Sequence, residues 1–170
     1  SFGGALETTP DQFDLLTALG PRATFLTSRA RAPYLEQSHN PHIINLSPPL
    51  NMQSKWFNKH LAFSLAKYGM SICTLGMATE FEPLGIAVNS LWPQTTIATT
   101  TINEHFSPEV YAGSRWPSIV ADAAFELAKL TRNECNGKFL TDEMLLRSRG
   151  VSDFSQYAVD TKAPLIQDLF

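Results

Sequence analysis

Two short apolar runs, each stopped by proline, constrain the fold of this chain more than any other feature. The first run covers His42–Ser47 and ends at Pro48-Pro49, and the second covers Gly85–Trp92 and ends at Pro93. Runs of this kind are typical of buried parallel strands, and proline stops them because it has no N–H to donate to a neighbouring strand. Between them lies a helical pattern over residues 57–81. A strand, a helix and a strand in that order predict an α/β fold with helices on the faces of a parallel sheet.

The remaining pattern adds three helices and a third strand. These are helices over residues 12–19, 22–35 and 119–130, and a strand over residues 138–142. Gly20-Pro21 should break the first helix from the second, because proline lacks the N–H and clashes one turn back. Thr9 or Asp11 can cap the first helix, and Ser118 can cap the third. The threonine-rich start of residues 94–117 predicts a mobile loop.

Composition and charge exclude several classes of function. The chain has 170 residues and a net charge of −3, without a run of basic residues. Its charge therefore does not favour nucleic acid or an anionic membrane as a partner. No apolar stretch approaches the ~18 residues of a membrane span.

The cysteines and histidines predict neither a disulfide framework nor a metal site. Cys73 and Cys135 lie far apart and outside any CxxC pattern. Two reduced thiols in an intracellular, reducing compartment, the cytoplasm or an organelle matrix, are the simpler expectation. His39 and His42 have H-x-x-H spacing, but they lie in a turn with a proline between them and no third ligand nearby, so no metal is expected.

An aromatic ring without a hydroxyl occupies the centre of the most informative motif. Phe63 and Lys67 form F-x-x-x-K on the helix predicted over residues 57–81, and Phe63 lies sixteen residues after Ser47. A serine, a tyrosine and a lysine at these positions would form an acid–base centre for hydride transfer to or from a carbonyl. Phe63 keeps the ring and lacks the hydroxyl that would exchange the proton.

Five phrases, in order and spacing, resemble the short-chain dehydrogenase/reductase superfamily and its hydroxysteroid-dehydrogenase-like branch. They are S-P-P-L-N from Ser47, the F-x-x-x-K motif, A-K-Y-G-M-S from Ala66, A-V-N-S-L-W-P from Ala87 and G-K-F-L-T-D-E from Gly137. The resemblance spans nearly the whole chain. It implies a single partial domain over residues 1–170, the C-terminal half of a Rossmann-type doubly wound parallel sheet, with three parallel strands and flanking helices.

The resemblance implies four catalytic positions. Ser47 matches the serine that hydrogen-bonds the substrate oxygen, and Lys67 matches the lysine that holds the nicotinamide ribose and lowers the pKa of the neighbouring phenol. Phe63 stands at the tyrosine that exchanges a proton with that oxygen. Gly20 stands at the helix asparagine that anchors a proton-relay water. Two of the four positions are therefore altered.

The cofactor that the resemblance implies is NAD or NADP. The residues at the family's cofactor positions are Lys67, Pro93, Thr96, Ile97 and Thr99. Gln94 stands where a glycine usually follows the proline, a change that this branch tolerates. The chain has no glycine-rich turn of the kind that receives the pyrophosphate. We therefore also keep the expectation that this chain binds no cofactor.

The candidate site residues could also be present for structural reasons alone. Phe63 would fill the core, Ser47 would bond a nearby backbone N–H at the strand end, and Lys67 would lie at the surface. The surrounding phrases favour the site for all three. For Asp142-Glu143 we favour a solvated strand end over a cation site. The threonines of residues 95–101 suit a phosphate-facing loop and an ordinary loop equally.

An open sheet edge and two apolar helices predict a protein partner or a homo-oligomer. If the family's sheet order is kept, the strand over residues 43–46 lacks its inner neighbour, and an unpaired strand edge invites another chain. In the family, the helices that correspond to residues 12–35 and 57–81 build a four-helix dimer interface. The small residues over 62–76 suit such an interface.

Three functions remain open. The first is a catalytically impaired subunit or scaffold within an oligomer or larger complex. The second is an NAD(P)-dependent oxidoreductase that acts on a hydrophobic carbonyl or alcohol, steroid-like or fatty-acyl-like, and is completed by a missing N-terminal half. The third is a lipid-binding module, indicated by the apolar loop around Trp56 and Trp92.

Overall fold

A three-stranded parallel sheet confirms the α/β fold. In the computed structural model its order is β1-β2-β3, where β1 is His42–Leu46, β2 is Ala87–Trp92 and β3 is Phe139–Thr141. The structure describes residues 3–58 and 60–168, so residues 1–2, 169–170 and residue 59 of the predicted helix lie outside it. Among the described strands β1 lies at an edge of the sheet, and its last residue, Leu46, is 49% exposed.

The chain divides into two compact units, described separately here. The first contains the residues up to Ser90 together with Thr131–Phe139, and the second contains Leu91–Leu130 and the residues from Leu140 on. The boundary falls within β2 and β3. The single partial domain over residues 1–170 stays a prediction.

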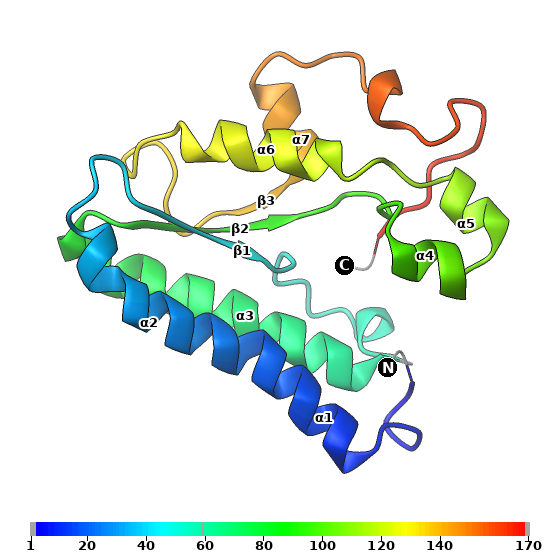
Figure 1. Ribbon diagram of the computed structural model, residues 1–170, viewed down its shortest axis with the longest axis horizontal. Coiled ribbons are helices and arrows are strands. Elements are labelled where there is room, and N and C mark those ends of the chain that lie inside the picture. The colour runs from blue at the N-terminus through cyan, green and yellow to red at the C-terminus, as the bar shows by residue number, and fades with distance from the viewer. Residues whose placement is uncertain (1–2, 59, 169–170) are drawn as a thin grey trace. The chain divides into compact units, whose positions relative to one another are not determined.

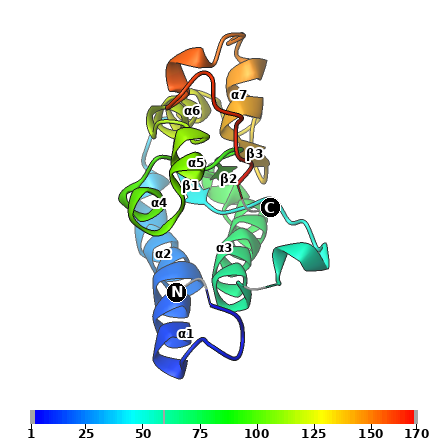
Figure 2. The ribbon, with the colours of Figure 1, turned by 90° about the vertical axis from the view of Figure 1, so that its right-hand side faces the viewer.

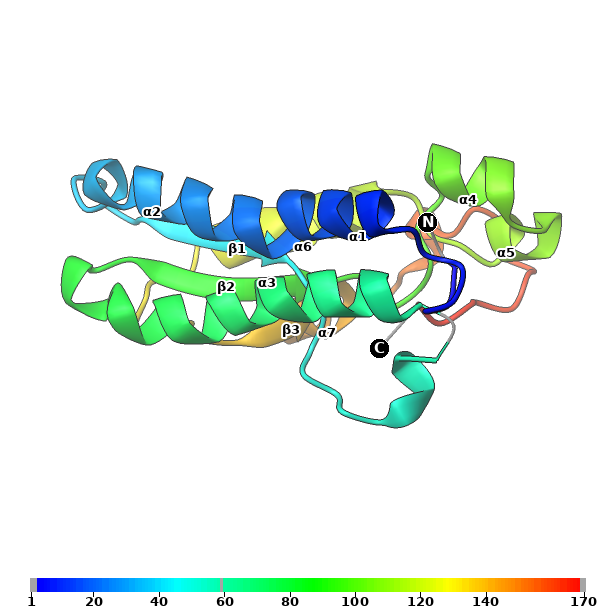
Figure 3. The same ribbon diagram turned by 90° about the horizontal axis from the view of Figure 1, so that it is seen from below.

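Three helices form the helical layer of the first unit: α1 (Pro10–Thr17), α2 (Ala23–Leu35) and α3 (Leu61–Glu80). α1 and α2 follow each other end to end and lie alongside α3, as Figures 1 and 3 show. Thr9 caps α1 in a capping box, so of the two predicted caps it is the one used. The core of this unit consists of buried apolar residues from α2, α3 and β2 and from the turn that joins α3 to β2, namely Ala32, Met77, Ala78, Phe81, Ile86 and Val88.

The predicted break between the first two helices is confirmed, and it takes the form of a π-helical turn. The turn covers Ala18–Arg22, and Gly20 within it has non-helical angles, φ −87° and ψ −105°. A Cβ on Gly20 would lie 3.2 Å from the Cβ of Ala66, and a Cβ on Gly69 would lie 2.8 Å from the Cβ of Pro21. Small residues of α3 therefore allow it to approach the break closely.

Gly69→Ala is expected to destabilise the protein by about 1–3 kcal/mol, because the new methyl group would overlap the Pro21 ring. Gly76→Ala is the matched control on the same helix. The space beside Gly76 is open, and alanine is favoured over glycine in a helix by about 1 kcal/mol. Urea unfolding of both variants measures the difference, and equal effects would contradict a close approach at Gly69.

The buried side of α3 is not the side that its apolar pattern predicts. Leu65, Ile72 and Leu75 are 49%, 63% and 51% exposed. The buried residues of α3 are instead mostly small or polar: Ala62, Ser64, Ala66, Tyr68, Ser71, Thr74, Met77 and Ala78. The helical period was predicted correctly, and the small and polar side is the buried one because its polar side chains bond a neighbouring segment of chain.

By length and composition alone, α3 would also be long and apolar enough to cross a membrane. A core helix packed inside a protein meets the same criterion. The buried hydroxyl groups of α3, which bond other parts of the chain, fit a core helix. The absence of a membrane span stays a prediction.

The second unit contains four short helices: α4 (Thr100–His105), α5 (Pro108–Ala112), α6 (Ser118–Ala128) and α7 (Asp142–Ser148). α6 and α7 pack against each other, as Figure 2 shows. Residues 94–117, expected to form a loop, contain α4 and α5, and the mobility of this segment stays a prediction. Ser118 is the first residue of α6 and not its cap. β3 ends at Thr141 because this residue caps α7, accepting a hydrogen bond from the Met144 N–H.

Candidate functional site

A polar stripe on α3 holds the segment that follows β1. Thr74, Ser71, Tyr68 and Ser64 recur at steps of three and four residues, which places them on one side of the helix. Thr74 Oγ1 accepts from Asn45 Nδ2 at 2.8 Å. Ser71 Oγ donates to the Pro48 carbonyl at 2.7 Å, and Ser64 Oγ donates to the Trp56 carbonyl at 2.9 Å. The Tyr68 hydroxyl donates to the Asn51 carbonyl. The segment thus runs antiparallel to the helix, and Ser47 lies within it.

The structure brings the four predicted catalytic positions to α3. Lys67 Nζ donates to the carbonyl of Leu46, the residue before Ser47, at 3.0 Å. Phe63 lies one helical turn before Lys67 and is half-buried. Gly20 is buried against Ala66, the residue before Lys67. All four positions therefore lie on α3 or on segments that contact it, and their grouping in one catalytic site stays a prediction.

Ser47 is completely buried, and its hydroxyl bonds another hydroxyl. Its Oγ shares a short hydrogen bond with the Oγ of Ser90 on β2. Thr74 Oγ1 lies 3.3 Å from the same Ser90 Oγ. This bond differs from the strand-end contact with a backbone N–H that residue type alone suggests. The sequence pattern did not single out Ser90 or Thr74.

The other predicted cofactor positions follow β2 in the second unit. Thr96 donates its N–H to the Ile166 carbonyl and accepts from the Arg115 N–H, both at 2.9 Å. Ile97 pairs with Arg115 in a parallel bridge, and the Thr99 side chain caps α4. Pro93 is half-buried at the end of β2. This segment is ordered by its own partners, and its contact with a cofactor stays a prediction.

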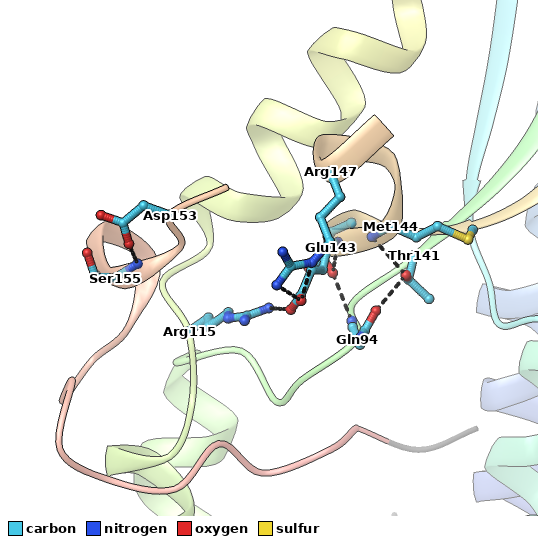
Figure 4. Close-up of polar contacts among 9 residues, drawn as sticks. Gln94, Arg115, Thr141, Glu143, Met144, Arg147, Asp153 and Ser155 are labelled. Atoms are coloured by element: carbon cyan, nitrogen blue, oxygen red, sulfur yellow. Dashed lines mark hydrogen bonds and ion pairs between the residues drawn. The ribbon is translucent and has the colours of Figure 1, made fainter. Parts of the chain in front are cut away.

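A partly buried ion-pair cluster that the sequence did not predict supports this segment (Figure 4). Glu143 Oε2 lies 2.5 Å from Arg115 Nη1, and Glu143 Oε1 accepts from Nε and Nη2 of Arg147 at 2.8 and 2.6 Å. Both guanidinium groups also lie over the ring of Phe154. Burial by itself would raise the pKa of Glu143, but the two arginines outweigh it and the pKa is lowered. The solvated strand end expected at Asp142-Glu143 is therefore wrong.

Asp142 joins the turn after β2 to the start of α7. It is completely buried, and its Oδ1 accepts from the Gln94 N–H at 2.9 Å and from the Glu143 N–H at 2.7 Å. The Gln94 side chain accepts from the Thr141 hydroxyl at 2.9 Å, which ties the same turn a second time (Figure 4). Burial raises the pKa of Asp142, although the two N–H groups and Arg115 oppose it.

Asp142→Asn is expected to gain stability relative to the natural chain as the pH rises from about 4 to about 7. A raised pKa means that the folded state prefers the neutral carboxyl group. The stabilisation it contributes is complete below the ordinary pKa and is lost as the pH rises through the raised value. Asparagine keeps an oxygen for the two N–H groups. Urea unfolding at both pH values tests this, with Asp142→Ala as the control that loses stability at both.

Residues 3–58 and 60–168 contain no group of three or more His, Cys, Asp or Glu side chains that could hold a metal ion. Cys73 and Cys135 are both free thiols. Burial raises the pKa of each thiol, which keeps it protonated. The intracellular, reducing compartment stays a prediction.

Comparison with known proteins places these features in a family. No family model matches the chain. It is 45% identical to hydroxysteroid dehydrogenase-like protein 2 of Danio rerio over 167 residues, 98% of this chain and 40% of the relative. It is 43% identical to the protein of the same name from Rattus norvegicus, over 100% of this chain and 32% of the relative. The chain thus spans well under half the length of these relatives.

Solved structures agree with the sequence relatives. A short chain dehydrogenase from Mycobacterium thermoresistibile matches with a TM-score of 0.92 and 36% identity, over 100% of this chain and 60% of that chain. More distant short-chain oxidoreductases share the fold at 20–22% identity, and among them are complexes with NADP and with NADH. The chain belongs to the short-chain dehydrogenase/reductase superfamily, in its hydroxysteroid-dehydrogenase-like branch.

Proposed function

We propose that this chain is a catalytically impaired short-chain dehydrogenase/reductase-like subunit that serves as a scaffold within an oligomer or larger complex. The observation that carries the proposal is Phe63, one helical turn before Lys67 on α3. A phenyl ring cannot exchange a proton, and general acid–base catalysis typically contributes about 10²–10⁴-fold. Position 63 therefore offers Lys67 no phenol whose pKa it could lower.

The direct test is an assay of the natural full-length protein that contains this chain. Apolar ketones and secondary alcohols are offered with NADH, NADPH, NAD or NADP, and the nicotinamide absorbance is followed. The expected result is no turnover above the background without protein. Turnover that disappears in a Lys67→Met variant would overturn the proposal, because it would show a working site around that lysine.

Cofactor binding can persist in a subunit that has lost turnover. The residues that would hold NAD or NADP are Lys67, Pro93, Thr96, Ile97 and Thr99. Lys67 fits this role, because its ammonium group has three donors and lies at the carboxyl end of β1, the end at which such sheets bind nucleotides. The bound cofactor would supply the hydride. Titration of the full-length protein with NADPH, followed by nicotinamide fluorescence, tests binding independently of turnover.

A second candidate is favoured by the two catalytic positions that are kept, Ser47 and Lys67. It is an NAD(P)-dependent oxidoreductase of a hydrophobic carbonyl or alcohol, steroid-like or fatty-acyl-like, completed by a further part of the protein. Ser47 would donate to the substrate oxygen and Lys67 would hold the cofactor. The lipid-binding module stays a prediction: Trp92 is buried and Trp56 half-buried.

The proposed association uses the exposed apolar sides of α1, α3 and the turn after α1. Leu15 and Leu19 are 58% and 70% exposed, and Leu65, Ile72 and Leu75 expose about half of their surface or more. Monomeric proteins rarely expose contiguous apolar patches larger than a few hundred Å². A hollow of about 250 Å³, lined by residues that include Phe13, Leu61 and Leu65, lies on the same helices. We infer that a second copy covers this surface, with the open edge of β1 as a further partner surface.

Ile72→Glu is expected to weaken self-association at least tenfold, because burying an unpaired carboxylate in an apolar interface is costly. Phe125→Glu on α6 is the matched control, since Phe125 is exposed to the same 63% as Ile72. Native mass spectrometry and sedimentation velocity of both variants report the assembly. A monomeric natural protein, or equal loss in the two variants, would contradict an interface on α3.

A further inference from the structure

Four buried polar side chains form a continuous chain between β1, α3 and β2. Asn45 Nδ2 lies 2.8 Å from Thr74 Oγ1, Thr74 Oγ1 lies 3.3 Å from Ser90 Oγ, and Ser90 Oγ shares a short bond with Ser47 Oγ. Ser47, Thr74 and Ser90 are completely buried, and Asn45 is 8% exposed. Because water does not reach these groups, each hydroxyl hydrogen needs an acceptor within the protein.

Counting donors and acceptors gives this chain a preferred direction. The Asn45 amide nitrogen only donates, so Thr74 Oγ1 accepts from it. The Met70 carbonyl only accepts, and it lies 3.3 Å from Thr74 Oγ1. When Ser47 donates to Ser90, Ser90 to Thr74, and Thr74 to the Met70 carbonyl, every hydroxyl hydrogen has an acceptor.

The opposite direction leaves one hydroxyl hydrogen, that of Ser47, without an acceptor in the chain. If Thr74 donates to Ser90 and Ser90 donates to Ser47, the Ser47 hydrogen points away from the chain and needs an acceptor outside it. A buried donor without an acceptor costs about 1–3 kcal/mol. The protein without ligand therefore favours the inward direction, in which Ser47 donates to Ser90.

We propose that Thr74 and Ser90 are positioning residues that determine the direction in which Ser47 donates its hydroxyl hydrogen. In the inward direction Ser47 has no hydrogen to offer a carbonyl oxygen. When such an oxygen accepts from Ser47, the chain reverses: Ser90 donates to Ser47 and Thr74 donates to Ser90. This inference rests on the proposed site at Ser47, whether that site turns over or only binds.

The reversal requires little rearrangement. Three hydroxyl hydrogens rotate about their C–O bonds, and no bond between heavy atoms changes. The one hydrogen bond given up is the 3.3 Å contact of Thr74 with the Met70 carbonyl, and the one gained is the bond from Ser47 to the ligand. Because Ser47 is completely buried, the ligand oxygen reaches it only after neighbouring side chains move. The ligand class is a small apolar molecule with one carbonyl oxygen.

Thr74→Val and Thr74→Ser form the matched pair that tests the proposal. Valine keeps the volume and removes the hydroxyl, and serine keeps the hydroxyl. NMR of the buried hydroxyl protons should show that valine shifts the Ser47 signal and speeds its exchange with solvent at least tenfold, although Ser90 lies between the hydroxyl groups of Thr74 and Ser47 in the hydrogen-bond chain. Serine should restore the natural signal. An unchanged Ser47 signal in the valine variant would overturn the proposal, as would a serine variant that behaves like valine.

Ser90→Ala is the second variant, and it keeps the test decisive if the valine variant does not fold. It leaves the bond between Asn45 and Thr74 in place and removes the partner of Ser47. The Ser47 hydroxyl signal should move, while Thr74 keeps its hydrogen bond to the Met70 carbonyl. A Ser47 signal that stays at its natural position would overturn the proposal, as would a Thr74 hydroxyl that no longer donates to that carbonyl.

Cyclohexanone tests the reversal in the natural protein, with cyclohexane as the control. The expected result is a joint shift of the Ser47, Ser90 and Thr74 hydroxyl protons with the ketone and none with the hydrocarbon. A shift at Ser47 alone would overturn the reversal. No shift at any of the three would overturn it too and would also show that Ser47 is not a carbonyl site, whereas the oxidoreductase assay decides on turnover separately.

Discussion

A phenol at position 63 is expected to raise turnover of an apolar ketone with NADH or NADPH by about 10²–10⁴-fold, the usual contribution of general acid–base catalysis. The change is Phe63→Tyr in the full-length protein. The new hydroxyl would lie one helical turn before Lys67, whose ammonium charge would stabilise the phenolate and lower the pKa of the phenol. Lys67 already lies at the strand end that holds Ser47. Initial rates by nicotinamide absorbance measure the effect.

The control is the double variant Phe63→Tyr with Lys67→Met, which keeps the new hydroxyl and removes the charge that activates it. It should lose most of the gain. A single variant no faster than the natural protein would contradict the view that one missing hydroxyl limits the chemistry, and would favour a scaffold that has lost more than its acid. A large gain in turnover would favour the second candidate function, an NAD(P)-dependent oxidoreductase with the same site.

The strands, and the places of two candidate site residues at their ends, could be predicted from local sequence. A proline after a short apolar run marks the end of a strand, and this placed Ser47 and Pro93 correctly. The i to i+4 spacing then placed Phe63 and Lys67 on one face of a helix. Gly20-Pro21 broke the preceding helix because proline cannot continue it, although the pattern alone did not indicate a π-helical turn.

The buried face of α3 could not be predicted in the same way. An apolar period tells which residues share a face, and it does not tell whether that face meets the protein's own core or another molecule. Ser64, Ser71 and Thr74 are buried because each bonds a residue of β1 or of the segment that follows it. Those partners lie 8 to 29 residues away in sequence. Leu65 and Ile72 remain exposed on the other side.

The pairing of Arg115 with Glu143 could not be predicted from the local sequence pattern either, because the two residues are far apart in sequence. Asp142-Glu143 resembled a polar strand end. The strand stops at Thr141, which caps a helix, and that helix buries Asp142 and leaves the Glu143 side chain only 12% exposed. The helices α4 and α5, with six and five residues, are too short to show a clear helical period.

Glu143→Gln is expected to lower the free energy of unfolding by about 3–5 kcal/mol, the usual cost of removing one partner of a buried ion pair. Glu143 holds both Arg115 and Arg147, and the side chain of Arg115 is only 4% exposed. The variant would leave that guanidinium buried without a carboxylate. Because the backbone of Arg115 pairs with Thr96 and Ala98, hydrogen exchange at the N–H groups of Arg115 and Ala98 should also speed up.

Glu126→Gln is the matched control, since Glu126 also contacts two cations, Lys129 at 2.5 Å and Arg149 at 3.2 Å. Lys129 and Arg149 are 47% and 42% exposed, so water screens these ion pairs and the expected loss is much smaller than that of Glu143→Gln. The pH dependence of the free energy of unfolding distinguishes Glu143→Gln from Glu126→Gln further. The pKa of Glu143 is lowered in the folded protein, so its stabilisation is present above the ordinary pKa and is lost as the pH falls through the lowered value. The gap between the natural chain and Glu143→Gln should therefore narrow in acid, and a gap that stays constant would contradict an ionised Glu143 as its source.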